Sequence, residues 1–94
     1  MTVEKTDKLV ALVEDEVTAN LVAMELLKSD ITDYVDVTPA TVYRARYLSG
    51  DRSITTFEGY KVSVSCAHLR SLRTGYDTFK KIVRERYNLD FCVD

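Results

Sequence analysis

The sequence has little of what enzyme motifs and metal sites require. It contains two cysteines, one histidine and three glycines in 94 residues. Cys66 and Cys92 are too few for a disulfide framework and lack the spacing of a metal site, so we expect free thiols in a reducing compartment. No CxxC, HExxH or glycine-rich phosphate loop is present. We therefore expect no enzyme activity, no metal and no cofactor.

The single histidine does not form a catalytic pair with the nearby cysteine. His68 follows Cys66 by two residues, and on a helix such positions point about 200° apart. A cysteine near a helix N-terminus can have a lowered pKa and be reactive. Because Cys66 has no partner base, we interpret it as a small side chain at the edge of the core.

Long hydrophobic runs are also absent. No apolar run approaches the roughly 18–20 residues that cross a bilayer, and the start, MTVEKTDK, lacks the pattern of a signal peptide. We expect a soluble, cytoplasmic protein. With 46% apolar residues, the chain can build one core, so we expect a single domain over residues 1–94. Such a small core leaves modest stability, which oligomerisation would supplement.

The charge is distributed unevenly, although the net charge is only −2. Residues 1–40 carry −6 and residues 41–94 carry +4. This split is typical of a basic half that binds nucleic acid or an acidic protein, or of self-association between unlike faces. It is equally consistent with two ordinary solvated surfaces.

Residues 41–65 predict a three-stranded antiparallel meander. In its last strand apolar and polar residues alternate as in a half-buried strand, with Tyr60, Val62 and Val64 against Lys61, Ser63 and Ser65. The first strand alternates more weakly, with Tyr43, Ala45 and Tyr47 against Arg44 and Arg46. Turns are expected at Ser49-Gly50-Asp51 and Glu58-Gly59. Thr38-Pro39 also suits a helix start, but the alternation favours a strand over residues 39–48.

Apolar residues at three- and four-residue steps predict a helix over residues 6–28, with one buried row of Val10, Val13, Val17, Leu21, Met24 and Leu27. In its second half, Val22 and Leu26 extend the apolar surface well beyond this row. A helix so apolar is normally covered on both sides. The second cover is either the C-terminal helix or another copy of the chain, which makes Val22 and Leu26 candidate self-association residues.

A second helix is predicted over residues 67–87, with Gly75 as a candidate kink and Asn88 as its C-terminal cap. The tail, residues 89–94, either adds a short edge strand or tucks an aromatic side chain against the core. The expected fold is therefore α+β, in the order α-β-β-β-α, with both helices packed on one face of the meander.

The connector over residues 29–37 carries three regularly spaced aspartates, Asp30, Asp33 and Asp36. It has no glycine and no following glutamate in the EF-hand positions, so it predicts a helix exit and no metal site. Tyr34 lies in this acidic connector and is expected to be exposed, as an aromatic anchor for a partner.

Two further surfaces are candidates for binding. Arg44, Arg46 and Lys61 should project from the sheet face opposite Tyr43 and Tyr60, and the acidic segment Glu14, Asp15 and Glu16 should lie off the apolar row of the first helix. Nucleic-acid binding through this basic half is an alternative. The expected element order matches the double-stranded-RNA-binding domain, but that family's loop histidine and lysine cluster are missing here.

The function that these features favour is non-catalytic. We expect a small regulatory or inhibitory binding protein that docks on a protein partner and occludes it, as many phage-encoded inhibitors do. The alternatives are nucleic-acid binding, or a homo-oligomer that sequesters a small anionic ligand. A homodimer or higher oligomer through the first helix is compatible with each of them, and no membrane partner is expected.

Overall fold

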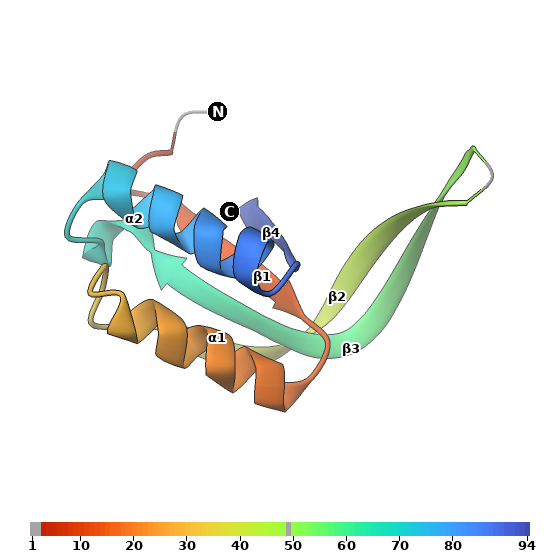
Figure 1. Cartoon of the computed structure of the whole chain (residues 1–94), viewed down its shortest axis with the longest axis horizontal. Helices are drawn as coiled ribbons and strands as arrows, with labels where there is room; N and C mark the ends of the chain where they lie inside the picture. Colours follow the sequence, from red (N-terminus) through yellow and green to blue (C-terminus); the bar gives the residue numbers. More distant parts are fainter. Residues whose placement is uncertain (1–2, 49) are drawn as a thin grey trace.

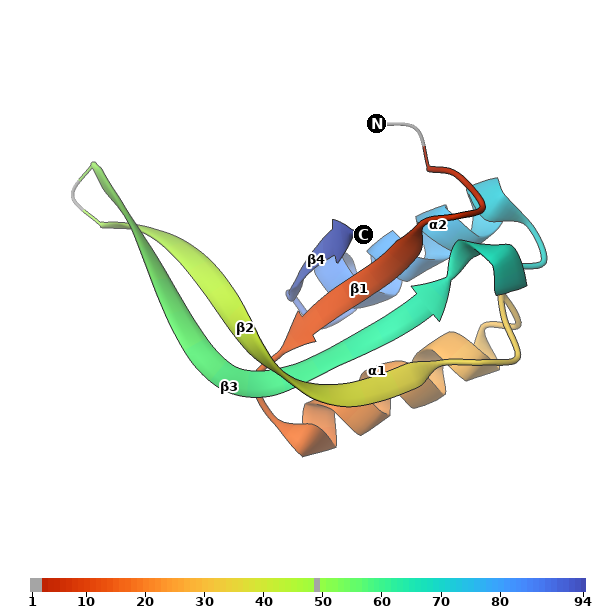
Figure 2. The same ribbon diagram turned by 180° about the vertical axis from the view of Figure 1, so that it is seen from behind.

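Four strands form one antiparallel sheet with two helices on one of its faces (Figures 1 and 2). The computed structural model describes residues 3–48 and 50–94, with the backbone alone for residues 44–48, 51 and 52. The strands are β1 (Lys8–Val13), β2 (Asp36–Leu48), β3 (Asp51–Ser65) and β4 (Asp90–Val93), in the spatial order β2-β3-β1-β4. The helices are α1 (Glu16–Lys28) and α2 (Leu72–Lys80), with a short 3-10 turn η1 (Cys66–His68) and a π-helical turn η2 (Lys81–Arg86) that continues α2. None of the described helices is long and apolar enough to cross a membrane.

The first strand, β1, lies where the sequence predicted the start of a helix. Its residues Leu9–Val13 form an unbroken apolar run and are all buried. A strand that is buried on both faces shows no alternation, and a short apolar run does not distinguish it from a helix. The predicted helix over residues 6–28 was therefore wrong in its first part, because α1 begins only at Glu16. Asp15 caps this helix: its carboxylate accepts a hydrogen bond from the Thr18 N–H at 2.9 Å. The element order is β-α-β-β-α-β instead of α-β-β-β-α.

The predicted meander consists of two long strands instead of three short ones. β2 and β3 pair along their whole length, from Asp36 opposite Ser63 to Leu48 opposite Asp51. The strand over residues 39–48 is confirmed. The loop residue Gly50 has φ 84°, as its predicted turn requires, whereas Ser49 lies outside the described residues.

Gly59 lies inside β3, so the predicted turn at Glu58-Gly59 was wrong. The reason for a glycine here is close contact between chain segments. A Cβ at this position would lie 2.4 Å from the carbonyl oxygen of Val13 and 2.8 Å from Cγ2 of Val42. The end of β1 and strand β3 therefore approach each other as closely as only a glycine permits.

The second helix is shorter than predicted, and the tail forms an edge strand. α2 begins at Leu72, and Ser71 caps its N-terminus; Gly75 lies inside the helix without breaking it. Asn88, with φ 53°, takes the left-handed conformation that ends a helix. β4 then pairs antiparallel with β1, from Leu9 opposite Val93 to Leu12 opposite Asp90. Of the two alternatives for the tail, the edge strand is confirmed.

The main core lies between the sheet and the two helices, which confirms that both helices cover the same face. Strand residues in this core are Leu9, Ala11, Val13, Val62 and Val64. Helix residues in it include Ala19, Val22, Leu26, Phe79 and Val83. A second, smaller apolar cluster lies on the opposite face of the sheet and consists of Val10, Leu12 and Val42.

The paired strands β2 and β3 extend well beyond the rest of the sheet. β1 pairs with β3 only between Tyr60 and Ser65. Residues 40–48 and 51–59 therefore form a two-stranded arm that projects from the body (Figure 1). The arm lies along the long axis of a molecule that measures 42 × 29 × 22 Å.

Candidate functional site

The sheet face without helices, here called the helix-free face, is turned toward the viewer in Figure 2. Val10 and Leu12 of β1 point to this face, because their neighbours in the strand point into the main core. Together with Val42 they are buried, and the side chains packed against them, Phe57 and Cys92, are only partly buried. An antiparallel sheet face that meets water normally carries polar residues, so this apolar centre is unusual for an uncovered face.

Lys61 lies on the helix-free face, opposite Leu12 on one side and Thr38 on the other. Tyr60, its neighbour, packs on the main core, so the two residues point to opposite faces as the alternation predicted. Arg44 and Arg46 belong to β2, and their backbones lie opposite Thr55 and Ser53. Their side chains lie outside the described residues, so the predicted basic surface of all three residues stays a prediction.

The acidic segment, Glu14, Asp15 and Glu16, lies at the junction of β1 and α1. The Asp15 carboxylate caps α1, and the hydrogen bonds from Thr18, that of its backbone N–H first, lower the pKa of Asp15. Glu16 accepts a hydrogen bond from the Tyr60 hydroxyl at 3.5 Å, on the helix side of the sheet. Glu16 and Lys61 thus lie on opposite faces of the sheet. Of the three carboxylates, Asp15 caps the helix.

The two predicted self-association residues of α1 lie in the core. Val22 and Leu26 are fully buried in the chain's own core, so they cannot contact another copy. The exposed apolar side chains of α1 are instead Val17, Leu21, Met24 and Leu27, with exposed fractions of 70%, 46%, 52% and 44%. We call these four residues the outer stripe. Self-association through the first helix stays a prediction, with different residues.

The outer stripe was visible in the sequence but was taken for the buried row. Both sides of α1 carry apolar residues, but the side chains on the buried side are smaller on average. The buried side combines Ala19 and Ala23 with Val22 and Leu26. Two alanines let the helix axis lie close to the sheet, which directs the larger side chains of the outer stripe to solvent. In a helix with apolar residues on both sides, the side with the alanines is the one that faces the core. This pattern was the signal available in the sequence.

Three arginines that flank α2 in the sequence form ion pairs. Arg70 binds Asp33 at 2.6 Å and Asp30 at 3.4 Å, and Arg84 binds Asp90 at 2.7 Å. The carboxylates hold the pKa of Arg70 above its usual value, the hydrogen bond to Asp33 first. Arg86 pairs with Glu25 of α1. Phosphate binding by these three arginines would have to replace their ion pairs.

A polar hollow of about 200 Å³ lies where β1 and β2 begin and β3 ends. Its lining residues carry two basic groups, two hydroxyls, a carboxylate and a phenol: Lys8, His68, Ser63, Ser65, Asp36 and Tyr34. Tyr34 is exposed, as predicted; it meets His68 edge to face, with ring centroids 6.1 Å apart, and donates a hydrogen bond to Asp36 at 3.3 Å. This is the described hollow whose groups best suit a small charged ligand.

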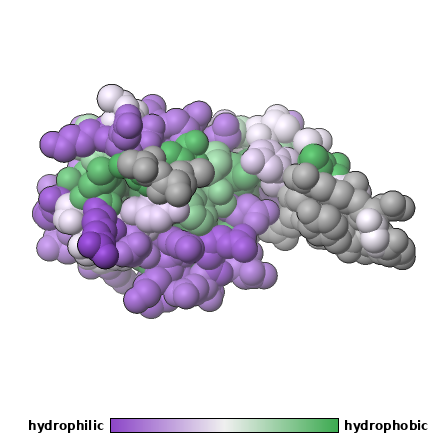
Figure 3. All heavy atoms as spheres, turned by 90° about the horizontal axis from the view of Figure 1, so that it is seen from above, coloured by the Kyte–Doolittle hydropathy of each residue, from purple (hydrophilic) through white to green (hydrophobic). Residues whose placement is uncertain are grey.

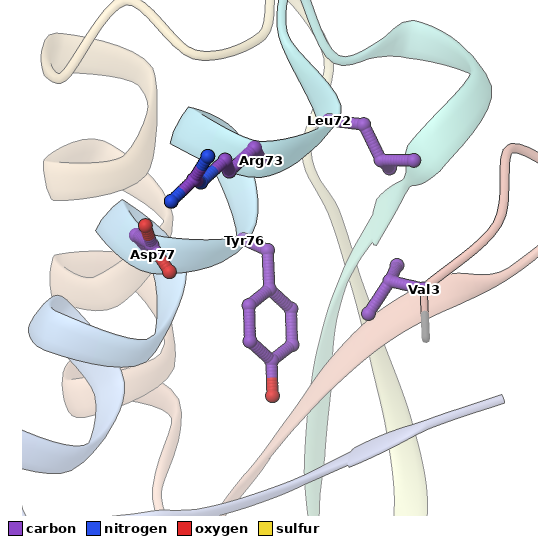
Figure 4. Close-up of a pocket in the computed structure, with 5 residues that line it drawn as sticks. All are labelled: Val3, Leu72, Arg73, Tyr76 and Asp77. Atoms are coloured by element: carbon purple, nitrogen blue, oxygen red, sulfur yellow. The ribbon is translucent and has the colours of Figure 1, made fainter. Parts of the chain in front are cut away.

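A second hollow, of about 290 Å³, lies beside α2 and is mainly apolar (Figure 4). Val3, Leu72 and Tyr76 form its apolar part, and Arg73 and Asp77 also line it. Seen from above, apolar side chains reach the surface in the middle of the body and again on the arm (Figure 3). The chain thus exposes apolar surface in more than one place.

Burial weakens both cysteines as nucleophiles at neutral pH. Burial raises the pKa of the Cys66 thiol, and the nearby Asp7 raises it further. Burial also raises the pKa of Cys92, with a smaller effect of Asp94 in the same direction. His68 is exposed and contacts Tyr34. Among residues 3–48 and 50–94 no group of three metal-ligating side chains is found.

Comparison with known proteins identifies the fold. No protein-family model matches the sequence, and no curated protein is similar to it in sequence. Among solved structures, CutA from Synechococcus elongatus PCC7942 is similar, with a TM-score of 0.61 and 15% sequence identity. The similarity covers 94% of this chain and 73% of that one. A likeness at such low identity concerns the course of the chain alone. The chain therefore has a CutA-like fold, a four-stranded antiparallel sheet with two helices in the order β-α-β-β-α-β.

Proposed function

We propose that this chain is a non-enzymatic binding protein that works as a homo-oligomer and, in that form, docks on a protein partner and occludes it. The observation that carries the proposal is the arm, which packs on β1 only near its root, through Val42 and Phe57. Nine residues of each strand, 40–48 and 51–59, pair only with each other. A two-stranded ribbon on its own is at best marginally stable in water, so the arm gains stability when another subunit covers it.

Exposed apolar side chains on the arm support this assembly. Ile54 is 60% exposed, and Tyr43 is exposed as well. At the root of the arm, Phe57 continues the apolar cluster of the helix-free face. By strand alternation, Tyr43 and Ile54 lie on the opposite side of the arm from Phe57. Another subunit that wraps around the arm and covers the helix-free face would remove both apolar surfaces from water, which is the main source of association energy.

The test of the assembly is the solution mass, measured by light scattering at low and high salt. The proposal expects a salt-resistant oligomer that Ile54→Glu dissociates, because a charge would then lie in the apolar contact. Thr74→Glu is the matched control: it adds the same charge on the exposed side of α2, three residues after the cap Ser71, where a glutamate suits a helix start. A monomeric wild-type protein, or an oligomer that Ile54→Glu leaves intact, would refute the assembly.

Docking on a protein partner is supported by Tyr34, an exposed aromatic side chain held edge to face by His68. Such anchors commonly carry binding energy at protein interfaces. The same scattering experiment, repeated with generic duplex DNA and RNA, decides between partner classes. A mass shift with nucleic acid at low salt that disappears at high salt, and is lost in Arg44→Glu and Arg46→Glu, would replace protein docking by nucleic-acid binding.

The polar hollow favours a second candidate function, the capture of a small anion by the oligomer. Lys8 offers positive charge, His68 offers a ring N–H, and Ser63 and Ser65 offer hydroxyl donors. Titration calorimetry with inorganic phosphate, and with a small carboxylate such as citrate, tests this candidate. Binding that Lys8→Gln abolishes would support it, and an absence of heat with both anions would exclude it for these probes.

A further inference from the structure

The polar hollow on the helix-free face carries opposite charges on its two sides. Lys8, Asp36, Ser63 and Ser65 all line it. Each of them points to the helix-free face, because a neighbour in its strand packs on the main core. The hollow therefore lies at the end of this face away from the arm, where β1 and β2 begin and β3 ends (Figure 2).

The register of the sheet arranges these four groups in a fixed order. β3 is the middle strand, with β1 on one side and β2 on the other. Lys8 lies opposite Ser65, and Asp36 lies opposite Ser63. The two hydroxyls therefore lie between an ammonium group and a carboxylate. Two strand spacings, roughly 10 Å in all, separate β1 from β2, a distance that a small molecule spans together with the long Lys8 side chain.

Both charged residues are exposed and can bind a ligand. Among the residues that the structure describes, no ion pair involves Lys8. Asp36 accepts a hydrogen bond from the Tyr34 hydroxyl at 3.3 Å, and a carboxylate has room for more than one such bond. A simple anion would be attracted by Lys8 and repelled by Asp36. A ligand with both a carboxylate and an ammonium group has a partner for each.

A second hollow shares two aromatic lining residues with the first. It has a volume of about 320 Å³, and Tyr34 and His68 line it together with Asp33. The two rings meet edge to face, with centroids 6.1 Å apart, and Arg70 binds Asp33 at 2.6 Å. Aromatic rings favour edge-to-face and offset contacts with a further ring. This part of the site therefore suits an aromatic side chain.

We propose that the two hollows together bind a free α-amino acid with an aromatic side chain. The carboxylate of the ligand binds the Lys8 ammonium group and the Ser65 hydroxyl, and its own ammonium group binds the Asp36 carboxylate. Its ring packs against Tyr34 and His68. This inference rests on the second candidate function proposed above, since it uses the same polar hollow, and it specifies the anion as one that also carries a positive charge.

Titration calorimetry of the full-length chain with L-phenylalanine and three related compounds tests the recognition of each group. N-acetylphenylalanine lacks the ammonium group, phenylalaninamide lacks the carboxylate, and L-alanine lacks the ring. The first two should bind at least about tenfold more weakly than phenylalanine, because each leaves a charged group without its partner. Alanine should also bind more weakly. A compound that binds as tightly as phenylalanine would refute the recognition of the group that it lacks.

Substitutions of the two charged residues show whether they contact the ligand. Lys8→Gln should weaken phenylalanine and N-acetylphenylalanine alike, since both carry the carboxylate. Asp36→Asn should weaken phenylalanine but not N-acetylphenylalanine, which has no ammonium group. Lys80→Gln is the matched control: it removes the same charge from the exposed end of α2 and should leave binding unchanged. If Asp36→Asn weakens both compounds equally, its role is structural and the inference is refuted.

The titrations with phosphate and citrate keep this inference separate from the second candidate function. If either anion binds through Lys8, but phenylalanine produces neither heat nor changes in the NMR amide shifts of Ser63 and Ser65, anion capture stands and the inference is overturned. If phenylalanine binds and neither anion does, the inference stands and capture of simple anions fails. Absence of binding by every probe refutes both.

Discussion

The two faces of the sheet are both apolar at their centres, but only one of them is covered. On the helix side, Leu9, Ala11 and Val13 of β1 pack beneath α1 and α2. On the other side, Val10 and Leu12 pack only with side chains of the sheet itself. A strand that alternates between core and water is half polar, whereas β1 has the composition of a strand with protein on both sides. The difference shows that the sequence of β1 fits an assembly better than an isolated chain.

The largest expected effect on stability comes from a substitution at Gly59, where the end of β1 lies against β3. In Gly59→Ala the new Cβ would lie 2.4 Å from the carbonyl oxygen of Val13, so the backbone itself has to move. We expect a loss of about 2–3 kcal/mol in the free energy of unfolding, measured by chemical denaturation.

Gly75→Ala is the control for this substitution. Its Cβ would meet the side chain of Leu69, which can rotate away, so its effect should be much smaller. Equal losses in the two variants would mean that the close approach at Gly59 is not what requires a glycine.

Two matched valine-to-alanine substitutions, one on each face of the sheet, compare how the two faces contribute to stability. Val64→Ala on the helix side and Val10→Ala on the helix-free face each remove the same atoms from a buried site, at a cost of about 2 kcal/mol. Only the loss in Val10→Ala should change with protein concentration, because the proposed assembly covers only that face. Thermal unfolding at low and high protein concentration measures the difference, and an identical concentration dependence would refute the link.

The reactivity of the two cysteines can be measured in the wild-type protein, with one cysteine on each of the two faces. Cys66 belongs to the helix-side core and Cys92 packs on the cluster of the helix-free face. Burial raises the pKa of both thiols, so each should react slowly with an alkylating reagent at neutral pH and faster as the pH rises toward that pKa. On dilution, Cys92 alone should become more reactive, as mass spectrometry of labelled peptides would show. Acceleration of both would indicate unfolding instead of dissociation.

The smallest expected effect on stability comes from a substitution of Asp15, the residue that caps α1. The pKa of Asp15 is lowered in the folded chain by the hydrogen bonds from Thr18, so its carboxylate stabilises α1 above the usual pKa of an aspartate. That contribution is lost as the pH falls through the lowered value. Asp15→Asn keeps an acceptor oxygen but not the charge, so its melting temperature should be slightly below that of the wild type at neutral pH and converge with it in acid. A gap that persists in acid would refute the role of the charge.

The sequence predicted the fold class, the strand over residues 39–48 and the common side of the helices, because alternation and helical period act locally. It did not predict β1, since the run Leu9–Val13 is compatible with either structure until its partners are known. These partners are distant: Lys8 lies opposite Ser65, and Leu9 opposite Val93.

The candidate surfaces were predicted only in part. Tyr34 is exposed as expected, whereas the apolar residues chosen for self-association proved to be core. The reason is that both sides of α1 are apolar, and the side that faces the sheet is decided by the fit of Ala19 and Ala23. Such a fit between distant segments is a property of the tertiary structure that no local pattern contains.

The pairing of β1 has a consequence for synthesis on the ribosome. The strand is translated before both of its neighbours, β3 and β4, which end at residues 65 and 93. Its five apolar residues therefore stay unpaired until β3 has been made, and its second edge is paired only when β4 has left the exit tunnel. A nascent chain of this kind is a natural substrate for chaperones that bind short apolar segments.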